Sequence, residues 1–527
     1  YQTSAVTGER LSQGFATAVG ALRDCETDGC AGAVDTGDAG AVVVDTAAGR
    51  QKVIGFGAAF TDAAAENFYK LPEAARDRFM NAFFGPAGIG YTLGRVPMNS
   101  CDFGREHYNF DDVPGDFELR HFDDKVSHDR LEKIPMLREA LARAPDSLKL
   151  FVSPWSPPAW MKQPVNNNQS MIQSAWPQGL LDDPATKRAW AKYFSKFIDA
   201  YKGVGLPIWG LTVQNEPENP GPWEACVYNP ASMRDFVRDY LGPEIRRRHR
   251  TVKIMAYDHN RDHLKDWTRT IFADEAAAAY VDGMAYHWYF GGLDRGLDGA
   301  YGWSQLGEAL ALMPEGKFLL SSESCNCPQV DHTFWGSWSR AEKMAHDVVA
   351  GLNGGSAGWV DWNILLDFDG GPNWVGNLCD TPVYCTEDFS DVVFSPMFYY
   401  MGQVSRFLRP GSTVLATTAV GNFTDGGARP SGVLIGYEAS SYKCEGSVRQ
   451  RWQLTQEGNL MMLDMMTEGI QYWAPVCLAR GVAPHTLAVQ TVVCSSADAG
   501  VYFLGDDGSL VLDGIASFPD TPAPTAA

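Results

Sequence analysis

Eight short runs rich in aliphatic, aromatic and small residues recur along the chain, and helical segments separate them. The runs are KVIGFGAAF from 52, GYTLGRVPM from 90, LKLFVSPW from 148, PIWGLTVQN from 207, VKIMAYD from 252, VDGMAYHW from 281, KFLLSSES from 317 and SAGWVDWN from 356. Between them, segments such as residues 189–203 have apolar residues at helical spacing. Strands that alternate with helices form parallel sheets, and eight such units predict an α/β fold with a closed (β/α)8 barrel.

Polar and aromatic side chains stand at or near the ends of these runs. They are Arg95, Trp155, Asn215, Glu216, Asp258, His287, Trp288, Glu323, Trp362 and Asn363, with Asp102 just beyond the second run. Active sites of (β/α)8 barrels form at the C-terminal ends of the strands. Acids, amides and indoles that converge on one rim therefore predict a site for a polar ligand.

The two ends of the chain differ from this central region. Residues 1–50 and 399–516 are rich in glycine and have alternating apolar patterns, which are typical of antiparallel strands. We expect an accessory all-β domain built from both ends, with the catalytic barrel over 51–398. The last residues, 517–527, have the composition of a flexible tail.

A weak internal repeat lies in the C-terminal region, where residues 442–463 align with 492–512 at an offset of 50. The alignment places Trp452 opposite Tyr502, and from about residue 442 the pattern resembles ricin-type lectin repeats. This resemblance implies a disulfide bond between Cys477 and Cys494. A β-sandwich with coincidental turns remains the alternative.

Charge and composition narrow the range of partners. The net charge of −21 disfavours binding to nucleic acid, and no run of 18 apolar residues is present to span a membrane. The 16 Trp residues favour a cleft that faces carbohydrate. No Cys/His cluster has metal-ligand spacing, so we expect neither a metal nor another cofactor.

The cysteines and glycosylation sequons indicate a compartment. The 11 cysteines include close pairs such as Cys379 with Cys385, and sequons begin at Asn168 and Asn422. The acidic composition suits an acidic or extracellular compartment. Together with a first residue that is not methionine, these features predict a secreted or lysosomal glycoprotein with disulfide bonds, whose signal peptide has been removed.

Two glutamates, Glu216 and Glu323, end the fourth and seventh runs, which lie nearly opposite each other in a barrel of eight strands. Two carboxyl groups that meet across a barrel mouth are the minimum equipment for glycoside hydrolysis. One must stay protonated so that it can donate a proton to the leaving oxygen, and the other must stay ionised so that it can attack the anomeric carbon. The amide of Asn215 is suited to hydrogen bond the sugar 2-hydroxyl.

The chain resembles glycoside hydrolase family 30, and within it the glucosylceramidase branch. The motifs that carry this resemblance cover about four-fifths of the chain, in order. They are KVIGFGAAFTDAAAENF at 52–68, GRVPMNSCDF at 94–103, SPWSPPAWMK at 153–162, TVQNEPE at 212–218, AYHWY at 285–289, SESC at 322–325, GWVDWN at 358–363, GGPNW at 370–374 and FSPMFYYMGQVSRFLRPGS at 394–412.

The resemblance implies a retaining β-glycosidase in which Glu216 is the acid/base and Glu323 is the nucleophile. The matching sugar-site residues are Arg95, Asp102, Phe103, Trp155, Asn215, His287, Tyr289, Trp362 and Asn377. We expect Arg95 to orient a carboxylate, His287 to be a buried hydrogen-bonding group near the nucleophile, and Cys325 to be a passive thiol. Cys101 and Cys226 match family positions and are expected to be unpaired.

The implied substrate is glucosylceramide or another β-glucoside, with a membrane-surface or activator contact for a lipid substrate. The paired carboxyl groups predict an acidic pH optimum. The loop NPGPWEACVY after Glu216 departs from the animal enzymes, which leaves β-1,6-glucan, β-xylosides and other β-glucosides as alternatives. A non-catalytic carbohydrate-binding protein is the alternative from another class, and the presence of both glutamates argues against it.

Overall fold

The computed structural model describes residues 41–144, 148–289, 303–327 and 338–420, together with short strands farther along the chain. The sequon at Asn422, the cysteine at 494 and the tail from 517 lie outside the described residues. Asn168, the start of the other sequon, is described and exposed.

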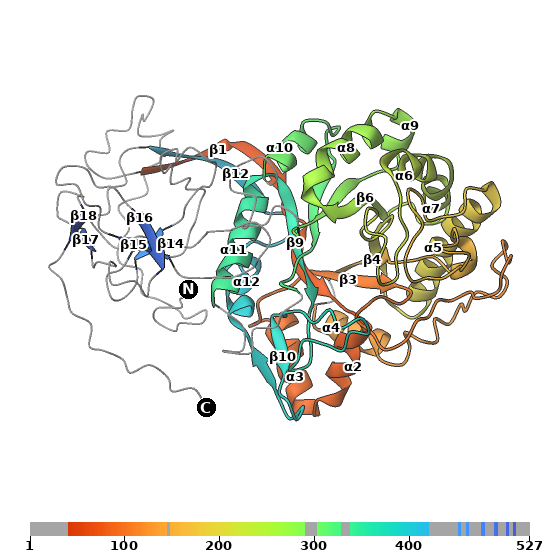
Figure 1. Cartoon of the computed structure of the whole chain (residues 1–527), viewed down its shortest axis with the longest axis horizontal. Helices are drawn as coiled ribbons and strands as arrows, with labels where there is room; N and C mark the ends of the chain where they lie inside the picture. Colours follow the sequence, from red (N-terminus) through yellow and green to blue (C-terminus); the bar gives the residue numbers. More distant parts are fainter. Residues whose placement is uncertain are drawn as a thin grey trace. The chain divides into compact units, whose positions relative to one another are not determined.

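Eight parallel strands close into a barrel in chain order, as the sequence predicts (Figure 1). The last strand completes the ring by pairing with the first. The strands are β2 (Gly55–Ala59), β3 (Leu93–Met98), β4 (Lys149–Pro154), β5 (Ile208–Thr212), β6 (Lys253–Asn260), β7 (Gly283–His287), β8 (Phe318–Glu323) and β9 (Ser356–Asn363). Seven of them lie within the predicted runs, and β6 extends two residues beyond its run, to Asn260.

Helices connect successive strands. They are α2 (Asp62–Lys70), α3 (Glu73–Phe84), α4 (Lys133–Arg143), α5 (Pro184–Gly203), α6 (Pro230–Phe236), α7 (Gly242–Arg248), α8 (Leu264–Phe272), α9 (Glu275–Ala278), α10 (Ser304–Leu310) and α11 (Trp338–Asn353), and α12 (Pro396–Ser405) follows the barrel. The described residues also form short 3-10 turns η1 (Ala159–Met161) and η3 (Arg261–His263) and the π-helical segment η2 (Val237–Leu241).

Helix α5 illustrates how local sequence and packing agree. The carboxylate of Asp183 accepts hydrogen bonds from two backbone amides of the first turn at 3.0 and 2.9 Å, and Pro184 occupies the first helical position. Proline is well tolerated there because that amide has no helical partner. The apolar face, which includes Trp190 and Phe194, is fully buried.

A layer of apolar side chains lies directly beneath the rim of the barrel. Leu93, Phe151, Met255, Ala285, Leu320 and Val360 form one buried cluster. Side chains two positions apart on a strand share a face. Leu93 therefore lies below Arg95, Ala285 below His287, and Val360 below Trp362, so the strands that build the core also direct polar groups into the mouth.

Segments from both ends of the chain form strands outside the barrel. Strand β1 (Ala41–Lys52) pairs with β12 (Thr413–Val420), and β10 (Val383–Cys385) pairs with β11 (Val392–Phe394). The remaining strands are β13 (Trp452–Leu454), β14 (Leu460–Met462), β15 (Val476–Ala479), β16 (Gln490–Val493), β17 (Tyr502–Leu504) and β18 (Leu510–Leu512). The domain boundaries drawn from sequence stay predictions.

Two hairpins of the C-terminal region follow the 50-residue repeat. In the β13–β14 pair Trp452 is opposite Met462, and in the β17–β18 pair Tyr502 is opposite Leu512. The two hairpins therefore have the same register at the predicted offset. The Cys477–Cys494 disulfide stays a prediction, because the second cysteine lies outside the described residues.

One disulfide bond in the described part of the chain differs from the pairing that sequence proximity suggests. Cys379 is bonded to Cys327, and Cys385 is a free, buried thiol. Chain folding, not closeness in sequence, decides which sulfurs meet. Cys101 and Cys226 are free and buried, as expected. Among the helices described, none has the length and apolar character needed to cross a membrane.

Candidate active site

The two glutamates meet at the mouth of the barrel. Glu216 follows β5 with a backbone φ of 45°, and Glu323 is the last residue of β8. A carboxylate oxygen of one lies within 4.8 Å of a carboxylate oxygen of the other. Retaining glycosidases hold their carboxyl groups about 5–5.5 Å apart, whereas inverting enzymes need about 6.5–9.5 Å for an intervening water. The spacing is that of the retaining class.

Arg95 is the fixed cation of the site. It is fully buried, and its guanidinium donates to the carboxylate of Glu323, to Asn215 Oδ1 at 2.8 Å and to Asp258 Oδ2 at 2.9 Å. Its Nε donates to Ser153 Oγ at 3.1 Å. A planar guanidinium presents donors in fixed directions, so one side chain can orient three acceptors at once. Arg95 thus lies where the sequence analysis places it, against a carboxylate.

A second chain of contacts runs from Asp258 through His287 to Glu216. His287 Nε2 lies 3.0 Å from Asp258 Oδ1, and its Nδ1 faces Glu216 Oε1 at 3.5 Å and Glu323 Oε1 at 3.9 Å. Thr212 also donates to Asp258, at 2.6 Å. Asp258 therefore holds both the guanidinium and the imidazole that face the two glutamates.

These contacts set the protonation of the histidine and its partners. Burial alone would lower the pKa of His287, but Glu323, Asp258 and Glu216 together raise it to about 9. Burial alone would raise the pKa of Asp258, yet Arg95 and His287 hold it well below its usual range. His287 is therefore cationic at neutral and acidic pH.

The pKa of Glu216 is lowered, whereas an acid that stays protonated needs a raised pKa. Burial raises this pKa, but the interactions with His287 and His259 outweigh burial and bring it down to about 2. In the free site the acidic proton is therefore held by the imidazole, 3.5 Å from Glu216 Oε1. Because His287 and Glu216 shift each other's pKa, the two groups titrate as a coupled pair.

The carboxylate of Glu323 is also held from the solvent side. Tyr289 donates its hydroxyl proton to Glu323 Oε1 at 2.6 Å, and the Tyr289 hydroxyl oxygen lies 3.3 Å from Cys325 Sγ. With Arg95 on the other carboxylate oxygen, both oxygens of Glu323 are oriented. A fixed, charge-compensated carboxylate is suited to nucleophilic attack.

Aromatic side chains form the apolar wall of the site. Trp155 and Trp362 stack with ring centroids 4.9 Å apart, and Phe103 contacts Trp362 edge-on at 5.7 Å. The guanidinium of Arg95 lies over both indoles, 4.8 Å from Trp155 and 5.4 Å from Trp362. Flat apolar faces beside hydrogen-bonding groups match the alternating character of a sugar ring.

The remaining predicted residues, Asp102 and Asn377, lie close to these groups. Asp102 is 4% exposed and accepts a hydrogen bond from Asn373 at 3.0 Å. Burial, followed by the charges of Glu224 and Glu323, raises the pKa of Asp102 to about 8. A carboxyl group that is neutral at acidic pH can both donate to and accept from sugar hydroxyls. The backbone amide of Asn377 donates to Asn373 Oδ1 at 3.0 Å, which places Asn377 on the same loop.

Several residues of the network were given no role in the site from sequence, although Asp258 was placed on the predicted rim. Asp258 stands at the end of a predicted strand, and that position was the available signal. Ser153, Thr212 and Glu224 carry no local signal, because each joins the site only through a contact made in the folded chain.

One side-chain atom of each of Glu216, His287 and Glu323 lies within 4.8 Å of the others, which is close enough for the three residues to bind a metal ion. Arg95 and the imidazolium already neutralise these carboxylates. The donor set thus favours acid–base and nucleophilic chemistry on an anomeric centre over metal binding.

Comparisons with known proteins agree with this geometry. The profile of the glycosyl hydrolase family 30 TIM-barrel domain matches residues 53–408. The lysosomal acid glucosylceramidase of Mus musculus is 35% identical over 379 residues, which are 70% of this chain and 70% of that protein. The endo-1,6-beta-D-glucanase of Neurospora crassa is 29% identical over 404 residues, with 72% of this chain and 76% of that protein covered.

Among solved structures, the crystal structure of SrfJ from Salmonella typhimurium superposes with a TM-score of 0.65 and 31% sequence identity. The match covers 73% of this chain and 81% of SrfJ. The barrel, the paired glutamates and the profile match agree: this chain belongs to glycosyl hydrolase family 30 and is a glycoside hydrolase.

Proposed function

We propose that this enzyme is a retaining β-glucosidase that hydrolyses glucosylceramide, with Glu323 as the nucleophile and Glu216 as the acid/base. The observation that carries the proposal is the short separation of the two carboxylates, with Arg95 and Tyr289 both donating to Glu323. That arrangement supports a double displacement without room for an intervening water.

In the first step, a Glu323 oxygen attacks the anomeric carbon as the bond to the leaving oxygen breaks. Glu216 gives that oxygen the proton that it receives from His287 across their 3.5 Å contact, and this leaves Glu216 ionised and His287 neutral. In the second step, Glu216 takes a proton from water, which attacks the glycosyl-enzyme and releases the sugar with its original configuration. Once Glu323 is esterified, its charge no longer raises the pKa of His287, which favours the transfer.

The glycone pocket is proposed to comprise Asp102, Asn215, Trp155, Trp362 and Asn377, with Phe103 supporting the indole wall. Asn215 Oδ1 is occupied by Arg95, so its amide NH2 is directed by that bond and can serve a sugar hydroxyl. The neutral carboxyl of Asp102 would hydrogen bond the hydroxyls at the far side of the ring.

Glucosylceramide is preferred as the substrate because the mouse relative is the more similar of the two enzymes compared. A lipid substrate requires a contact with a membrane surface or with an activator, and a β-glucosidase of this kind would work in a secreted or lysosomal setting. The second candidate is hydrolysis of β-1,6-glucan, which the Neurospora relative favours.

A direct experiment separates the two substrates. Fluorescent glucosylceramide in anionic micelles, a β-1,6-glucan and an aryl β-xyloside should be compared by kcat/KM. The proposal expects glucosylceramide to rank first, and a higher value for the glucan would transfer the assignment to the second candidate. Proton NMR of the first-formed sugar should show the β-anomer, whereas the α-anomer would exclude a retaining mechanism.

A further inference from the structure

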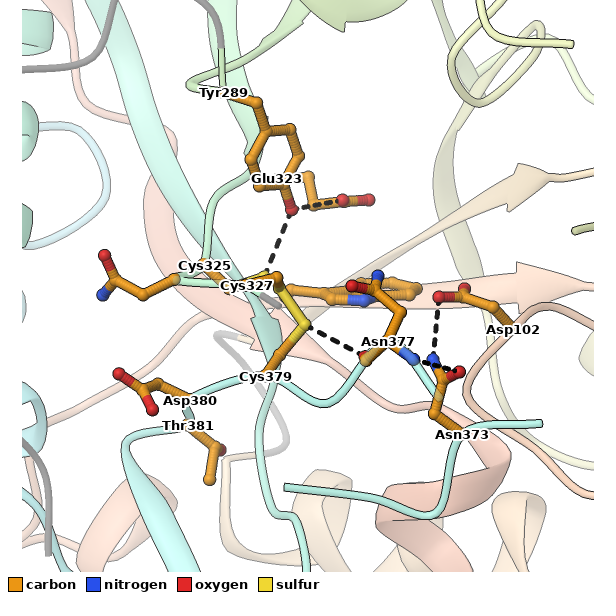
Figure 2. The surroundings of a disulfide bond; sticks show 12 residues. Asp102, Tyr289, Glu323, Cys325, Cys327, Asn373, Asn377, Cys379, Asp380 and Thr381 are labelled. Carbon is orange, nitrogen blue, oxygen red and sulfur yellow. Dashed lines mark hydrogen bonds between the residues drawn. A yellow bond between two sulfur atoms is a disulfide. The ribbon is translucent and has the colours of Figure 1, made fainter. Parts of the chain in front are cut away.

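Three sulfur atoms form a cluster beside the nucleophile (Figure 2). Cys325 is a free thiol that lies two residues after Glu323, and its Sγ is 2.7 Å from Cys327 Sγ. Cys327 is bonded to Cys379, and the three sulfurs lie within 4.8 Å of one another. A free thiol in contact with a disulfide is the arrangement from which thiol–disulfide exchange proceeds.

The disulfide joins two segments that both build the glycone pocket. Cys327 follows the strand end that carries Glu323 by four residues. Cys379 lies two residues beyond Asn377, and its sulfur is 3.4 Å from the Asn377 carbonyl oxygen. The same loop carries Asn373, whose side chain donates to Asp102, as Figure 2 shows. The bond therefore ties the loop that orients Asp102 to the segment that follows the nucleophile.

The free thiol reaches the nucleophile through one hydroxyl group. Tyr289 OH contacts Cys325 Sγ at 3.3 Å and donates to Glu323 Oε1 at 2.6 Å (Figure 2). A change in the bonding of Cys325 would therefore alter the environment of the tyrosine that orients the nucleophile.

We propose that the Cys327–Cys379 disulfide is a positioning element of the glycone site, and that Cys325 can release it by internal thiol–disulfide exchange. The Cys325 thiolate attacks Cys327 Sγ, the Cys325–Cys327 bond forms, and the Cys327–Cys379 bond breaks. The electron pair leaves with Cys379 Sγ, which takes up the proton that Cys325 lost. The exchange involves no net oxidation or reduction.

The surroundings of Cys325 keep this exchange slow in acid. Burial raises the pKa of the Cys325 thiol well above its usual value, and the carboxylates of Glu323, Asp361 and Asp102 raise it further. The Tyr289 hydroxyl opposes this through its contact with the sulfur. Because the thiolate is the attacking species, the Cys327–Cys379 disulfide persists at acidic pH, and its exchange with Cys325 accelerates as the pH rises.

The exchange is tested first by mapping, without reference to activity. The full chain is held in parallel near pH 5 and near pH 9, quenched in acid, unfolded and labelled with N-ethylmaleimide at acidic pH. After the acidic incubation, the label should fall on Cys325 and not on Cys379. After the alkaline incubation, Cys379 should gain label and a Cys325–Cys327 disulfide peptide should be present. An unlabelled Cys379 after both incubations would overturn the exchange.

The positioning role, which rests on the proposed function, is tested by activity on an aryl β-glucoside. Activity after alkaline incubation is expressed relative to each variant's own untreated activity. Wild type and C385A, which removes another buried free thiol, should lose activity in proportion to the label on Cys379. C325A and C325S should retain theirs. Equal losses in all four proteins would contradict the proposal.

A second variant removes the Cys327–Cys379 disulfide and leaves Cys325 unchanged. C327S/C379S should raise KM for the aryl glucoside by ~10-fold or more, because the Asp102-orienting loop is no longer fixed. An unchanged KM would overturn the positioning role. The mapping result stands apart from the substrate assignment, because it would be obtained even if the enzyme preferred β-1,6-glucan.

Discussion

Arg95 shows how one residue can set the charge of a whole site. It is fully buried and contacts two carboxylates, Glu323 and Asp258, so neither negative charge is left alone in the barrel mouth. Its guanidinium also lies over both indoles of the apolar wall. Residues of this kind serve catalysis and stability together, because removing them exposes every partner at once.

Replacing Arg95 by Gln is expected to lower the free energy of unfolding by about 3–5 kcal/mol, the usual cost of leaving buried charges unpaired. Urea unfolding measures the change. Arg105 offers a matched control, because it is paired with Glu66 but its side chain is 62% exposed. R105Q should change stability by no more than about 0.5 kcal/mol, and a similar effect from both replacements would contradict the central position of Arg95.

Tyr289 offers a test confined to the nucleophile. Y289F removes the hydroxyl that donates to Glu323 at 2.6 Å, and hydrogen bonds to charged groups contribute about 1.5–3 kcal/mol. We expect kcat/KM to fall by ~10–150-fold. Y69F removes a hydroxyl that contacts Glu139 at 3.3 Å and should leave kcat/KM unchanged. A wild-type rate for Y289F would show that Arg95 alone orients the carboxylate.

Among the elements, strands and helices were predictable where local pattern determines them. The barrel strands lie in the eight runs because buried parallel strands need continuous apolar stretches. The convergence of the strand-end residues at one rim follows from the barrel topology. Asp258 as the shared acceptor of Arg95 and His287, and the bond between Cys327 and Cys379, depend on contacts across strands and loops that no local pattern encodes.

Helix α5 gives a prediction at the same scale. D183A removes the side chain that caps two backbone amides and should cost about 1 kcal/mol of stability. The adjacent Asp182 is 71% exposed and pairs with Lys187 at the surface, so D182A should change stability by no more than about 0.5 kcal/mol. Thermal unfolding of both variants distinguishes the cap from general loss of charge, and equal effects would reject the capping role.

For the molecule as a whole, the pH dependence of stability should reflect the buried imidazole. His287 has a folded-state pKa of about 9, above its ordinary value of 6.5. Its contribution is therefore fully present below about pH 6.5 and is lost as the pH rises through about 9. The stability gap between wild type and H287N should shrink by up to about 3 kcal/mol over that interval.

Urea unfolding at a series of pH values measures this gap. H121N provides the control, because His121 is 62% exposed and its side chain pairs with Asp116 at the surface. H121N should differ from wild type by no more than about 0.5 kcal/mol, as is usual for an exposed substitution. A constant gap for H287N would mean that His287 does not hold its proton in the folded enzyme.

The central claim is that Glu323 attacks the sugar while Glu216 handles the proton, and covalent trapping tests it most directly. The enzyme should be inactivated by a 2-deoxy-2-fluoro-β-glucosyl fluoride, digested and mapped by mass spectrometry. The account predicts one added fluoroglucosyl group, carried by Glu323, and E216Q should still be labelled because a fluoride leaving group needs little acid assistance. Labelling of Glu216 or of another carboxylate, or inactivation without a covalent adduct, would contradict it.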